Sequence, residues 1–507
     1  MPIAAAIALA VVLPRLLVMQ VSVIDWDESS YALVAQQWLD GHVPYSTVFD
    51  HKPIGLYAIF AAFFLAFGDS VFTIRLVALV FAVGTALLLA RSAERQFGSS
   101  PWLGAWVAAV YGLSSVANGG LATNTEILVN FFVALAVWLL VCVRGAGELS
   151  VERRLAIGAS LGAAFQVNYL AGILAMGFAA FYLSWIASLR PVSLLLRRYL
   201  LDGAVMLAGF VGLWVLLLLP VMIAGDLRDY FGLQFAYLSD YASVTSSATI
   251  ARRVSEALLP WWSLCALALA LAACQLASVR RALRIEDAAE VIRDRRLTSW
   301  LILTAFGLLT ASASGYFYHH FFLFALPGLV MLGAAFLGIV IDSPRLRVFC
   351  AAWLLLMAGA SLLVSYETLG RGLRAHRAVL DGRPPDSVAA IGRYLSDRLE
   401  TGETIFVFEQ QPVLYFLTRT TPPSRLAFPN FYLFDFLAPH FGTTPGELLT
   451  EALDARPRFI VAGSHRASHA DLDAVHVFYA RLAREYVPVS ATDPGAPAIV
   501  LELARKP

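Results

Sequence analysis

Three carboxylates stand within four residues directly after the first apolar segment of the chain: Asp25, Asp27 and Glu28. Acids this close repel one another, so their clustering needs a structural or a chemical reason. In the structural interpretation, Asp27 caps a helix and Glu28 complements the helix dipole. In the chemical interpretation, one of the carboxylates is a general base that takes a proton from a reacting group.

A second polar group follows in the same stretch, Asp50-His51-Lys52-Pro53. Lys52 is the only lysine before Lys506, in a chain that otherwise uses arginine as its cation. A single lysine at a bilayer interface is often a side chain that reaches from the apolar phase to water. A cation that accompanies an acidic cluster is also what a site combining a base with a bound phosphate needs. The residues alone leave both interpretations open.

Two further groups stand next to apolar segments. Glu126, in Asn124-Thr125-Glu126, is either an ordinary acid at a helix start or a functional one, because an acid at the edge of an apolar helix is costly. The run Tyr316-Phe317-Tyr318-His319-His320 precedes another apolar segment. Adjacent side chains diverge on a helix, so the two histidines alone do not predict a metal site. Aromatic belts at membrane interfaces explain the tyrosines without a function.

The elements that position these groups must be mostly membrane helices. The chain has 507 residues, of which 59% are hydrophobic and 14% charged, with a mean hydropathy of +0.70. Soluble proteins carry about 25% charged residues. A net charge of +1 gives no electrostatic basis for binding nucleic acid. Apolar segments long enough to span a bilayer predict about eleven transmembrane helices, near residues 3–23, 71–90, 101–118, 123–143, 155–168, 170–188, 199–223, 260–279, 299–314, 321–341 and 346–365.

The loop charges predict the orientation of these spans. With a cytoplasmic N-terminus, the inside loops contain sixteen arginines and the outside loops four basic residues. The positive-inside rule favours this arrangement. It places the four polar groups at one outer membrane face, and it places the polar tail after the last span outside as well, in a periplasm.

Two outside segments have their own pattern. In the loop 24–70, a stripe of apolar residues from Tyr31 to Trp38 predicts a short helix that ends at Gly41. The apolar run Ile54–Phe67 is too short to span and is predicted to lie at the interface. The segment 224–259 is polar and could order over a bound ligand.

The tail alternates predicted helices and strands. Helical patterns at 385–399, 445–455 and 471–486 alternate with strand patterns at 404–409, 458–462 and 498–503. This alternation predicts a small α/β domain. The predicted domains are therefore 1–365, a membrane domain with the external loop 24–70, and 366–507, a periplasmic α/β domain. The tail contains no glycine-rich phosphate loop, nucleophile elbow or HExxH motif, so a lid or scaffold role is favoured for it.

The motifs carry a resemblance to a known family. The stretch from Asp25 to Gly41, the run Phe49-Asp-His-Lys-Pro-Ile-Gly-Leu-Tyr57, and then Arg75 resemble the first external loop of the GT-C membrane glycosyltransferases. Within that superfamily they are most similar to the bacterial branch of aminoarabinose transferases and protein O-mannosyltransferase-like enzymes. Tyr318–Pro327 resembles a later motif of these enzymes at the periplasmic edge, and Ile405–Pro429 resembles the periplasmic domain of some members. The implied fold is a multispanning α-helical GT-C fold with a small C-terminal α/β domain.

The resemblance implies an activity and assigns residues to it. Members transfer a sugar from a polyprenyl-phosphate donor to an acceptor at the outer face, with inversion. Asp27 matches the proposed general base, Glu28 is its neighbour in the Asp-Glu pair, and Glu126 stands where many members have a second acid. Lys52 would hold the donor phosphate. The other residues expected near the donor are His51, Tyr318 and His320. The sequence differs from the family pattern at Lys52-Pro53-Ile54, where many members have Lys-Pro-Pro. This difference makes the assignment to one branch of the superfamily less specific.

The partners and the rival function follow from the same resemblance. The expected partners are the lipid-linked donor, membrane lipids and a lipid, glycan or protein acceptor, and the expected location is the bacterial inner membrane. No nucleotide is required, no cofactor and no metal ligand is assigned, and a divalent metal beside Asp27 and Glu126 stays an option. The rival is a transporter or flippase of a lipid-linked sugar. Such a protein is expected to have internal repeats and broken helices at mid-membrane, and the sequence shows no convincing internal symmetry.

Overall fold

The computed structural model describes residues 1–98, 100–143, 149–187, 189, 191–224, 230–232, 234, 246–285, 295–433, 438–463, 472–489 and 498–504. The chain forms two compact units. The helical unit contains Met1–Leu16, Ala78–Leu217 and Ser243–Leu369, and the mixed unit contains Leu17–Val77, Leu218–Ala242 and Gly370–Pro507. The expectation that 224–259 orders over a ligand falls partly outside the described residues, and it stays a prediction.

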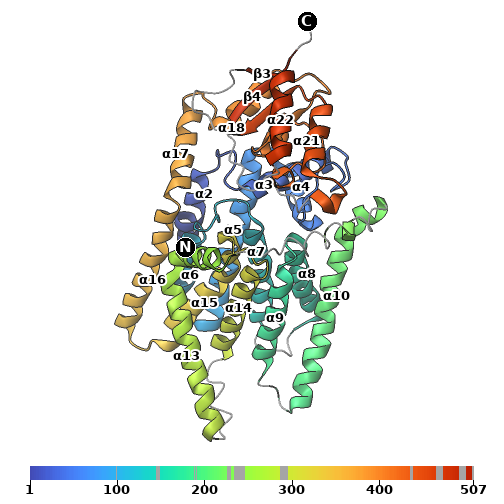
Figure 1. The fold of residues 1–507 in the computed structure, drawn as a ribbon. Coiled ribbons are helices and arrows are strands. Elements are labelled where there is room, and N and C mark those ends of the chain that lie inside the picture. Colours follow the sequence, from blue (N-terminus) through green and yellow to red (C-terminus); the bar gives the residue numbers. More distant parts are fainter. Residues whose placement is uncertain are drawn as a thin grey trace. The chain divides into compact units, whose positions relative to one another are not determined.

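Long apolar helices make up the helical unit and its continuations (Figure 1). The first helix combines α1 (Pro2–Ile7), a π-helical turn (Ala8–Val12) and α2 (Leu13–Leu17). The others are α5 (Val71–Phe97), α6 (Pro101–Ser114), α7 (Thr125–Val141), α8 (Val151–Val167), α9 (Ala171–Ile186), α10 (Val192–Ala224), α12 (Ser247–Leu258), α13 (Trp262–Ile285), α14 (Arg295–Ser312), α15 (Leu326–Ala335) and α16 (Pro344–Val364).

Each of the eleven predicted segments contains a helix, but the first one ends early. It was expected to continue to Val23, whereas α2 ends at Leu17, and the carbonyl groups of Val21 and Ser22 bond to Arg75 instead of to a further helical turn. Among the described residues, five helical stretches are long and apolar enough to cross a membrane: Val71–Phe97, Val192–Ala224, Ser247–Ala277, His319–Val340 and Pro344–Val364. The chain is therefore a multi-pass membrane protein, and the count of about eleven spans stays a prediction.

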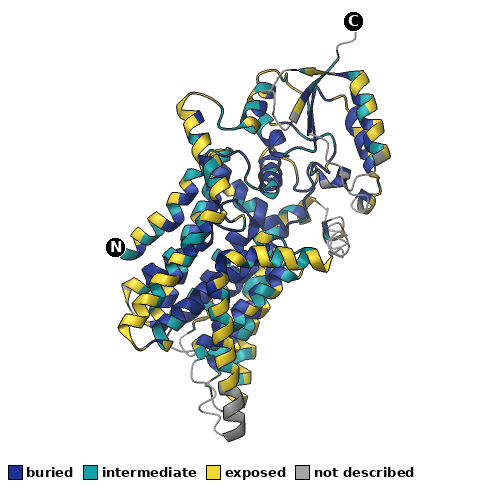
Figure 2. Cartoon of the chain, turned by 60° about the vertical axis from the view of Figure 1, so that its left-hand side comes forward, coloured by how far each residue is buried: buried dark blue, intermediate teal, exposed yellow. Residues whose placement is uncertain are grey.

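Burial distinguishes central from peripheral helices (Figure 2). In the most apolar part of His319–Val340, 78% of the residues are buried, against 17% for Val192–Ala224 and for Pro344–Val364. An apolar helix that exposes most of its surface would be unstable in water, whereas acyl chains can cover it. This contrast places α15 in the core of the helical unit and makes α10 and α16 lipid-facing.

Small residues let α8 and α10 approach closely. A Cβ atom at Gly158 would lie 1.8 Å from the carbonyl oxygen of Met206, and one at Gly209 would lie 2.2 Å from that of Leu155. Close approach through small residues is a main source of helix association in bilayers, where burial against lipid gains little. The same two helices are joined by an ion pair of 3.0 Å between Arg154 and the buried Asp202.

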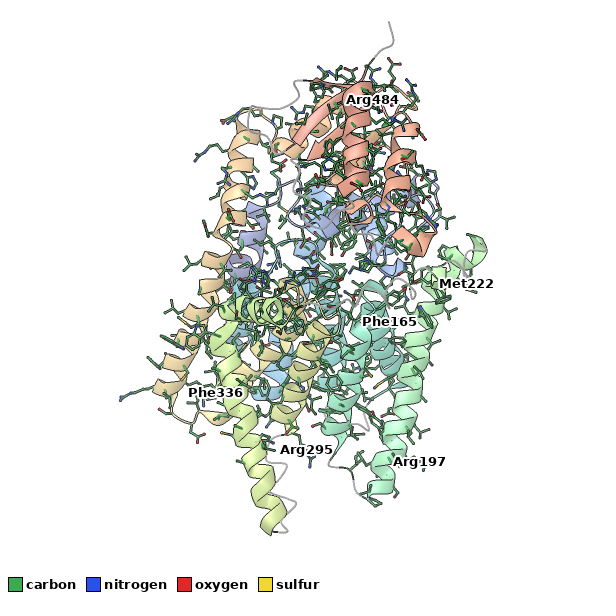
Figure 3. All side chains as sticks on the ribbon, viewed as in Figure 1. Phe165, Arg197, Met222, Arg295, Phe336 and Arg484 are labelled. Carbon is green, nitrogen blue, oxygen red and sulfur yellow. The ribbon has the colours of Figure 1, made fainter. Side chains whose placement is uncertain are left out.

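The ends of two helices support the predicted placement of the basic loops. Figure 3 shows Arg197, near the start of α10, and Arg295, at the start of α14, at the same end of the helical unit. The sequence assigns both arginines to inside loops. Their common position is what the positive-inside rule requires of them.

The mixed unit contains a four-stranded sheet. Its strands are β1 (Ile405–Phe408), β2 (Phe459–Gly463), β3 (Tyr486–Val489) and β4 (Ala498–Leu503), in the order β1-β2-β4-β3. The pair β1–β2 is parallel, and β4 is antiparallel to both β2 and β3. The helices of this part are α17 (Tyr366–Leu380), α18 (Ser387–Ser396), α19 (Val413–Thr418), α20 (Asn430–Leu433), α21 (Pro445–Asp454) and α22 (Leu472–Glu485).

The six elements predicted in the tail coincide with α18, β1, α21, β2, α22 and β4. The strand β3 and the helix α17 were not predicted, because β3 is short and follows α22 directly, and α17 continues from the last apolar helix after a single residue. That this part is a separate extramembrane domain, with a boundary at residue 366, stays a prediction.

The external loop belongs to the same compact unit as the tail. It contains the helices α3 (Trp26–Leu39) and α4 (Ile54–Phe67), which pack on each other, and α3 also packs on α19. The backbone N–H of Phe49 donates to the carbonyl of Arg425 at 2.7 Å, and the Gln36 amide donates to the carbonyl of Phe416 at 3.3 Å. The helices that carry the acidic cluster and the lysine are therefore supported by the tail.

The close contact of α8 and α10 gives a testable prediction for stability. Gly158→Ala should lower the unfolding temperature of the purified protein by several degrees, because the added methyl group forces the two helix backbones apart and overpacking costs about 1–3 kcal/mol. Gly203→Ala on α10 is the matched control, since a Cβ there meets nothing within 4 Å. Equal unfolding temperatures for both variants would contradict the close packing.

Candidate active site

The acidic cluster forms the start of α3. Asp25 is the N-cap residue: its side chain accepts a hydrogen bond from the Asp27 backbone N–H at 3.3 Å, and it forms a capping box with Glu28. The structural interpretation that Asp27 caps this helix was therefore wrong. A cap must precede the first helical turn, and α3 begins one residue before Asp27. At its other end the helix stops at Leu39, and Gly41 follows with a φ of 97°, as the glycine predicted.

Glu28 is committed to a buried ion pair. Its carboxylate and the Arg75 guanidinium face each other in a two-bond contact, and both side chains are 1% exposed. Glu28 also accepts hydrogen bonds from the backbone N–H groups of Ile24 at 2.7 Å and Asp25 at 3.3 Å. With its oxygens occupied in this way, Glu28 is built to position the start of α3, and its predicted direct catalytic role stays a prediction.

Arg75 completes this junction by bonding to the backbone. Its Nε and Nη2 donate to the carbonyl of Val21 at 3.2 and 3.0 Å, and Nη2 also approaches the carbonyl of Ser22 at 3.4 Å. A buried guanidinium needs both a counter-charge and acceptors for its remaining donors, and this environment supplies both. Arg75 thereby joins the first turns of α5, the segment after the first helix and the start of α3.

Asp27 is the acid of the cluster whose carboxylate neither caps α3 nor forms an ion pair with any residue that the structure describes. It is half-buried, and its Oδ2 accepts a hydrogen bond of 3.3 Å from the Tyr31 hydroxyl one turn later. Its position in the first turn of α3 puts the carboxylate where the helix dipole favours a negative charge. Tyr31 in turn packs edge-on against Phe60 of α4, with ring centroids 6.1 Å apart.

The Asp50–Lys52 segment holds the other predicted groups. His51 Nδ1 lies 3.2 Å from Asp50 Oδ1. Burial raises the pKa of Asp50, but the hydrogen bond from His51 and the charges of His51 and Lys52 lower it more, so that the pKa lies below its usual value. Asp50 is therefore an anion at neutral pH. Its carbonyl oxygen accepts a hydrogen bond of 3.0 Å from Gln234.

Lys52 is held by its backbone rather than by its side chain. Its carbonyl accepts hydrogen bonds from the hydroxyls of Tyr45 at 2.9 Å and Tyr57 at 3.3 Å. Lys52 is 7% exposed, and its ammonium group makes no hydrogen bond or ion pair with any described residue. A buried cation without a bonded partner is costly, and such a group is suited to an anionic ligand.

Glu126 belongs to the helical unit, in the first turn of α7. It is 1% exposed; its Oε1 accepts a hydrogen bond from the Thr125 hydroxyl at 3.1 Å, and its Oε2 has no hydrogen-bond partner among the described residues. Asn168, just after the end of α8, donates to the same Thr125 hydroxyl at 2.9 Å. A buried acid with one unmatched oxygen differs from an ordinary helix-start acid, which lies in water.

Tyr318 and His320 form part of an aromatic stack in the helical unit. The rings of Tyr316 and Tyr318 are parallel with centroids 5.3 Å apart, and Tyr318 stacks on His320 at 5.8 Å. The Arg253 guanidinium lies 4.8 Å from the centre of the Tyr318 ring. His319 points elsewhere and lies 3.1 Å from Glu256, so the two histidines diverge as predicted.

The predicted site residues thus fall into two sets. The structure places Asp27 and Glu28, on α3, and His51 and Lys52, just before α4, in the mixed unit, and it places Glu126, Tyr318 and His320 in the helical unit. Among the residues that the structure describes, no group of three or more histidine, cysteine or acidic side chains is placed to hold a metal ion.

Three contributors to the site were not assigned a role from the residues: Asp25 as the cap, Arg75 as the partner of Glu28, and the tyrosines that hold Lys52. The signal for Arg75 was available, because a cation in the first turns of an apolar helix needs a partner. Arg15, inside the first apolar helix, follows the same logic: it donates to the Ser115 hydroxyl at 3.1 Å and to the carbonyl of Gly120 at 2.9 Å.

Comparison with known proteins places this site in a family context. Residues 51–223 match the family model of dolichyl-phosphate-mannose-protein mannosyltransferases. That range contains Lys52, Arg75 and Glu126, and it excludes Asp27. No curated protein sequence is similar enough to this chain to count as a match.

The fold is also similar to solved structures. The crystal structure of ArnT from Cupriavidus metallidurans bound to undecaprenyl phosphate has a TM-score of 0.59 and the apo form one of 0.55. Each is 14% identical, and the match covers 98% of this chain and 97% of ArnT. The arabinofuranosyltransferase AftD from Mycobacteria is 16% identical over 99% of this chain and 40% of its own, and its TM-score of 0.46 is too low to support an argument.

These findings confirm the resemblance to the GT-C glycosyltransferases. The chain has an ArnT-like GT-C fold, and the predicted enzyme class, a membrane glycosyltransferase, is the class of the matched family. At 14% identity the likeness to ArnT shows the fold and leaves the substrates open.

The ion pair of Glu28 gives the prediction of this subsection. Glu28→Gln should lower the unfolding temperature markedly, because removing one partner of a buried ion pair costs about 3–5 kcal/mol. Asp381→Asn is the matched control: it breaks an ion pair with Arg383 in which the side chains are 52% and 66% exposed, so thermal unfolding should hardly change. Equal, small effects of both variants would show that the Glu28–Arg75 pair does not hold the junction.

Proposed function

We propose that this protein is a polyprenyl-phosphate-dependent glycosyltransferase of the bacterial inner membrane. It moves a sugar to an acceptor at the periplasmic face, with inversion, and Asp27 is the general base. One observation carries the proposal: within the acidic cluster, Asp25 caps α3 and Glu28 pairs with Arg75, so the Asp27 carboxylate is the one left for chemistry.

The base is needed because the acceptor is a hydroxyl group. In the proposed step the acceptor oxygen forms a bond to the anomeric carbon while the bond from that carbon to the phosphate oxygen breaks. The hydroxyl proton passes to Asp27, and the electron pair of the broken bond leaves with the lipid phosphate. A positioned base contributes about 10²–10⁴-fold to such a step.

Lys52 is proposed to bind the donor phosphate. A lipid monophosphate is already a good leaving group, so it needs stabilisation of its negative charge more than it needs a proton donor. The buried ammonium group without a bonded partner offers that stabilisation. The ArnT structure with undecaprenyl phosphate supports a donor of this chemical class for a chain with the same fold. The neighbouring His51, which is paired with Asp50, is proposed to border the phosphate.

Inversion follows from a single displacement with no covalent intermediate on the protein. The base and the phosphate-binding group must then act from opposite faces of the anomeric carbon. Asp27 lies in the first turn of α3, and Lys52 lies just before α4, which packs on α3. The two groups therefore come from separate segments, as a base and a phosphate-binding group on opposite faces of the anomeric carbon require.

For residues of the helical unit we propose the roles that the resemblance implies. Glu126, with its unmatched buried oxygen, is proposed as the second acid, and Tyr318 and His320 are proposed to lie beside the donor. No step of the proposed mechanism is assigned to a metal ion. The tail is proposed to act as an extramembrane α/β domain that supports the loop.

The base assignment is tested by Asp27→Asn. The variant should lose transfer by about 10²–10⁴-fold, because an amide cannot accept the hydroxyl proton. Its unfolding temperature should stay unchanged, since among the described residues the Asp27 carboxylate has one hydrogen bond, and that bond is long. Asp40→Asn at the exposed end of the same helix is the matched control and should transfer normally. Near-normal activity of Asp27→Asn would eliminate the base assignment.

The phosphate assignment is tested by Lys52→Gln. The variant should chiefly raise the KM for the lipid-linked donor, and Lys52→Arg should restore part of donor use because it restores the charge. Steady-state kinetics in which donor and acceptor are varied separately measures both effects. A change confined to the acceptor KM would argue against a phosphate role. If the wild type binds the donor but transfers the sugar to none of the acceptors, the flippase alternative is favoured.

A further inference from the structure

A group of arginines surrounds a cavity of about 440 Å³ in the mixed unit, and none of the proposed catalytic or donor-binding residues lines it. Its lining includes Arg371, Arg374 and Arg377 of α17, Arg383 of the following turn, and Val21 from the segment after the first helix. One carboxylate, Asp386, also borders it. Like charges at a spacing of three residues on a helix repel, so this arrangement costs helix stability unless an anion offsets it.

The protein itself supplies little of that negative charge. Asp386 accepts hydrogen bonds from the backbone N–H and hydroxyl of Ser22, both at 2.8 Å, and from the N–H of Ala389 at 2.9 Å, so its oxygens are already engaged. Arg371 donates to the carbonyl of Val23 at 2.7 Å, and Arg383 pairs with Asp381 at 2.8 Å.

Two of the arginines remain. Among the described residues, the side chains of Arg374 and Arg377 make neither a hydrogen bond nor an ion pair, and both are exposed at the cavity. Two guanidinium groups one turn apart can each offer two parallel N–H donors to the oxygens of a phosphate group.

The rest of α17 indicates what carries that phosphate. Gly372, Ala375 and Ala378 form its buried face, and a Cβ at Gly372 would lie 2.1 Å from the Leu17 carbonyl oxygen. Leu373 and Leu380, seven residues apart and so on one line of the helix, are 56% and 86% exposed. At 100° per residue, the arginines lie between this apolar line and the buried face.

A helix that presents arginines beside exposed leucines fits the boundary between headgroups and acyl chains. The sequence agrees, because Arg371 comes seven residues after Val364, which ends the lipid-facing helix α16. In bulk water the exposed apolar side chains of Leu373 and Leu380 would be hydrated unfavourably. A free anion would not bury them, whereas the acyl chains of a lipid would.

We infer that this cavity is a binding site for the phosphate group of an anionic lipid, formed by Arg374 and Arg377 and bordered by the apolar line of α17. The lipid is a membrane phospholipid with a negatively charged headgroup. The inference does not rest on the proposed transferase activity, because it requires only that the protein lies in a membrane.

The test measures binding to the full-length protein in nanodiscs of neutral lipid. The probes are soluble short-chain phosphatidic acid, short-chain phosphatidylcholine of the same chain length, and inorganic phosphate. The variant is Arg374→Gln/Arg377→Gln, and the matched control is Arg393→Gln/Arg484→Gln, two exposed arginines outside the cavity.

We expect phosphatidic acid to bind the wild type and the control equally, and the cavity variant at least tenfold more weakly, with a salt dependence that the variant loses. Inorganic phosphate should bind the wild type at least tenfold more weakly than phosphatidic acid, and phosphatidylcholine should not distinguish the proteins. Equal affinity of the cavity variant for phosphatidic acid would overturn the inference. Inorganic phosphate binding as tightly as the lipid would overturn the lipid assignment. Asp27→Asn should bind like the wild type, which separates this result from the catalytic proposal.

Discussion

The buried pair of Glu28 and Arg75 is the interaction on which the candidate site depends. Two charges that are each 1% exposed pay a large desolvation cost, and they persist only with good geometry and with their remaining donors and acceptors satisfied. Here the backbone N–H groups before α3 and the carbonyls of Val21 and Ser22 meet that need. The pair therefore fixes three chain segments at one point, and α3 starts there.

The three neighbouring acids at this junction have different roles. Asp25 caps α3, and Glu28 joins its first turn to Arg75. Asp27 lies between them and carries a half-buried carboxylate on a helix start that several contacts hold in place. A base needs such fixed placement more than it needs strength, because a small displacement from the reacting proton is costly in rate. The Lys52 segment follows the same principle, since two tyrosine hydroxyls hold its carbonyl and leave the ammonium group to a ligand.

Much of this architecture was predictable from the sequence, and the exceptions have physical causes. Apolar length located a helix in each of the eleven segments, and alternating patterns located six elements of the tail, because both signals are local. The acids, the lone lysine and Glu126 were recognisable by their cost at a membrane. The Glu28–Arg75 pair joins residues 47 apart in sequence, and local patterns do not reveal such pairs. The choice between Asp25 and Asp27 as the cap depends on a shift of two residues in the helix start, which amphipathic patterns do not resolve.

The most direct test of the central claim is transfer itself. Purified protein would be incubated with radiolabelled polyprenyl-phosphate sugars and a membrane extract as the acceptor source, and the label would be followed into new products. The account predicts that label leaves the lipid carrier and appears in an acceptor without any added nucleotide sugar. Label that remains on the carrier with every sugar and every extract, while the carrier still binds, would contradict a transferase.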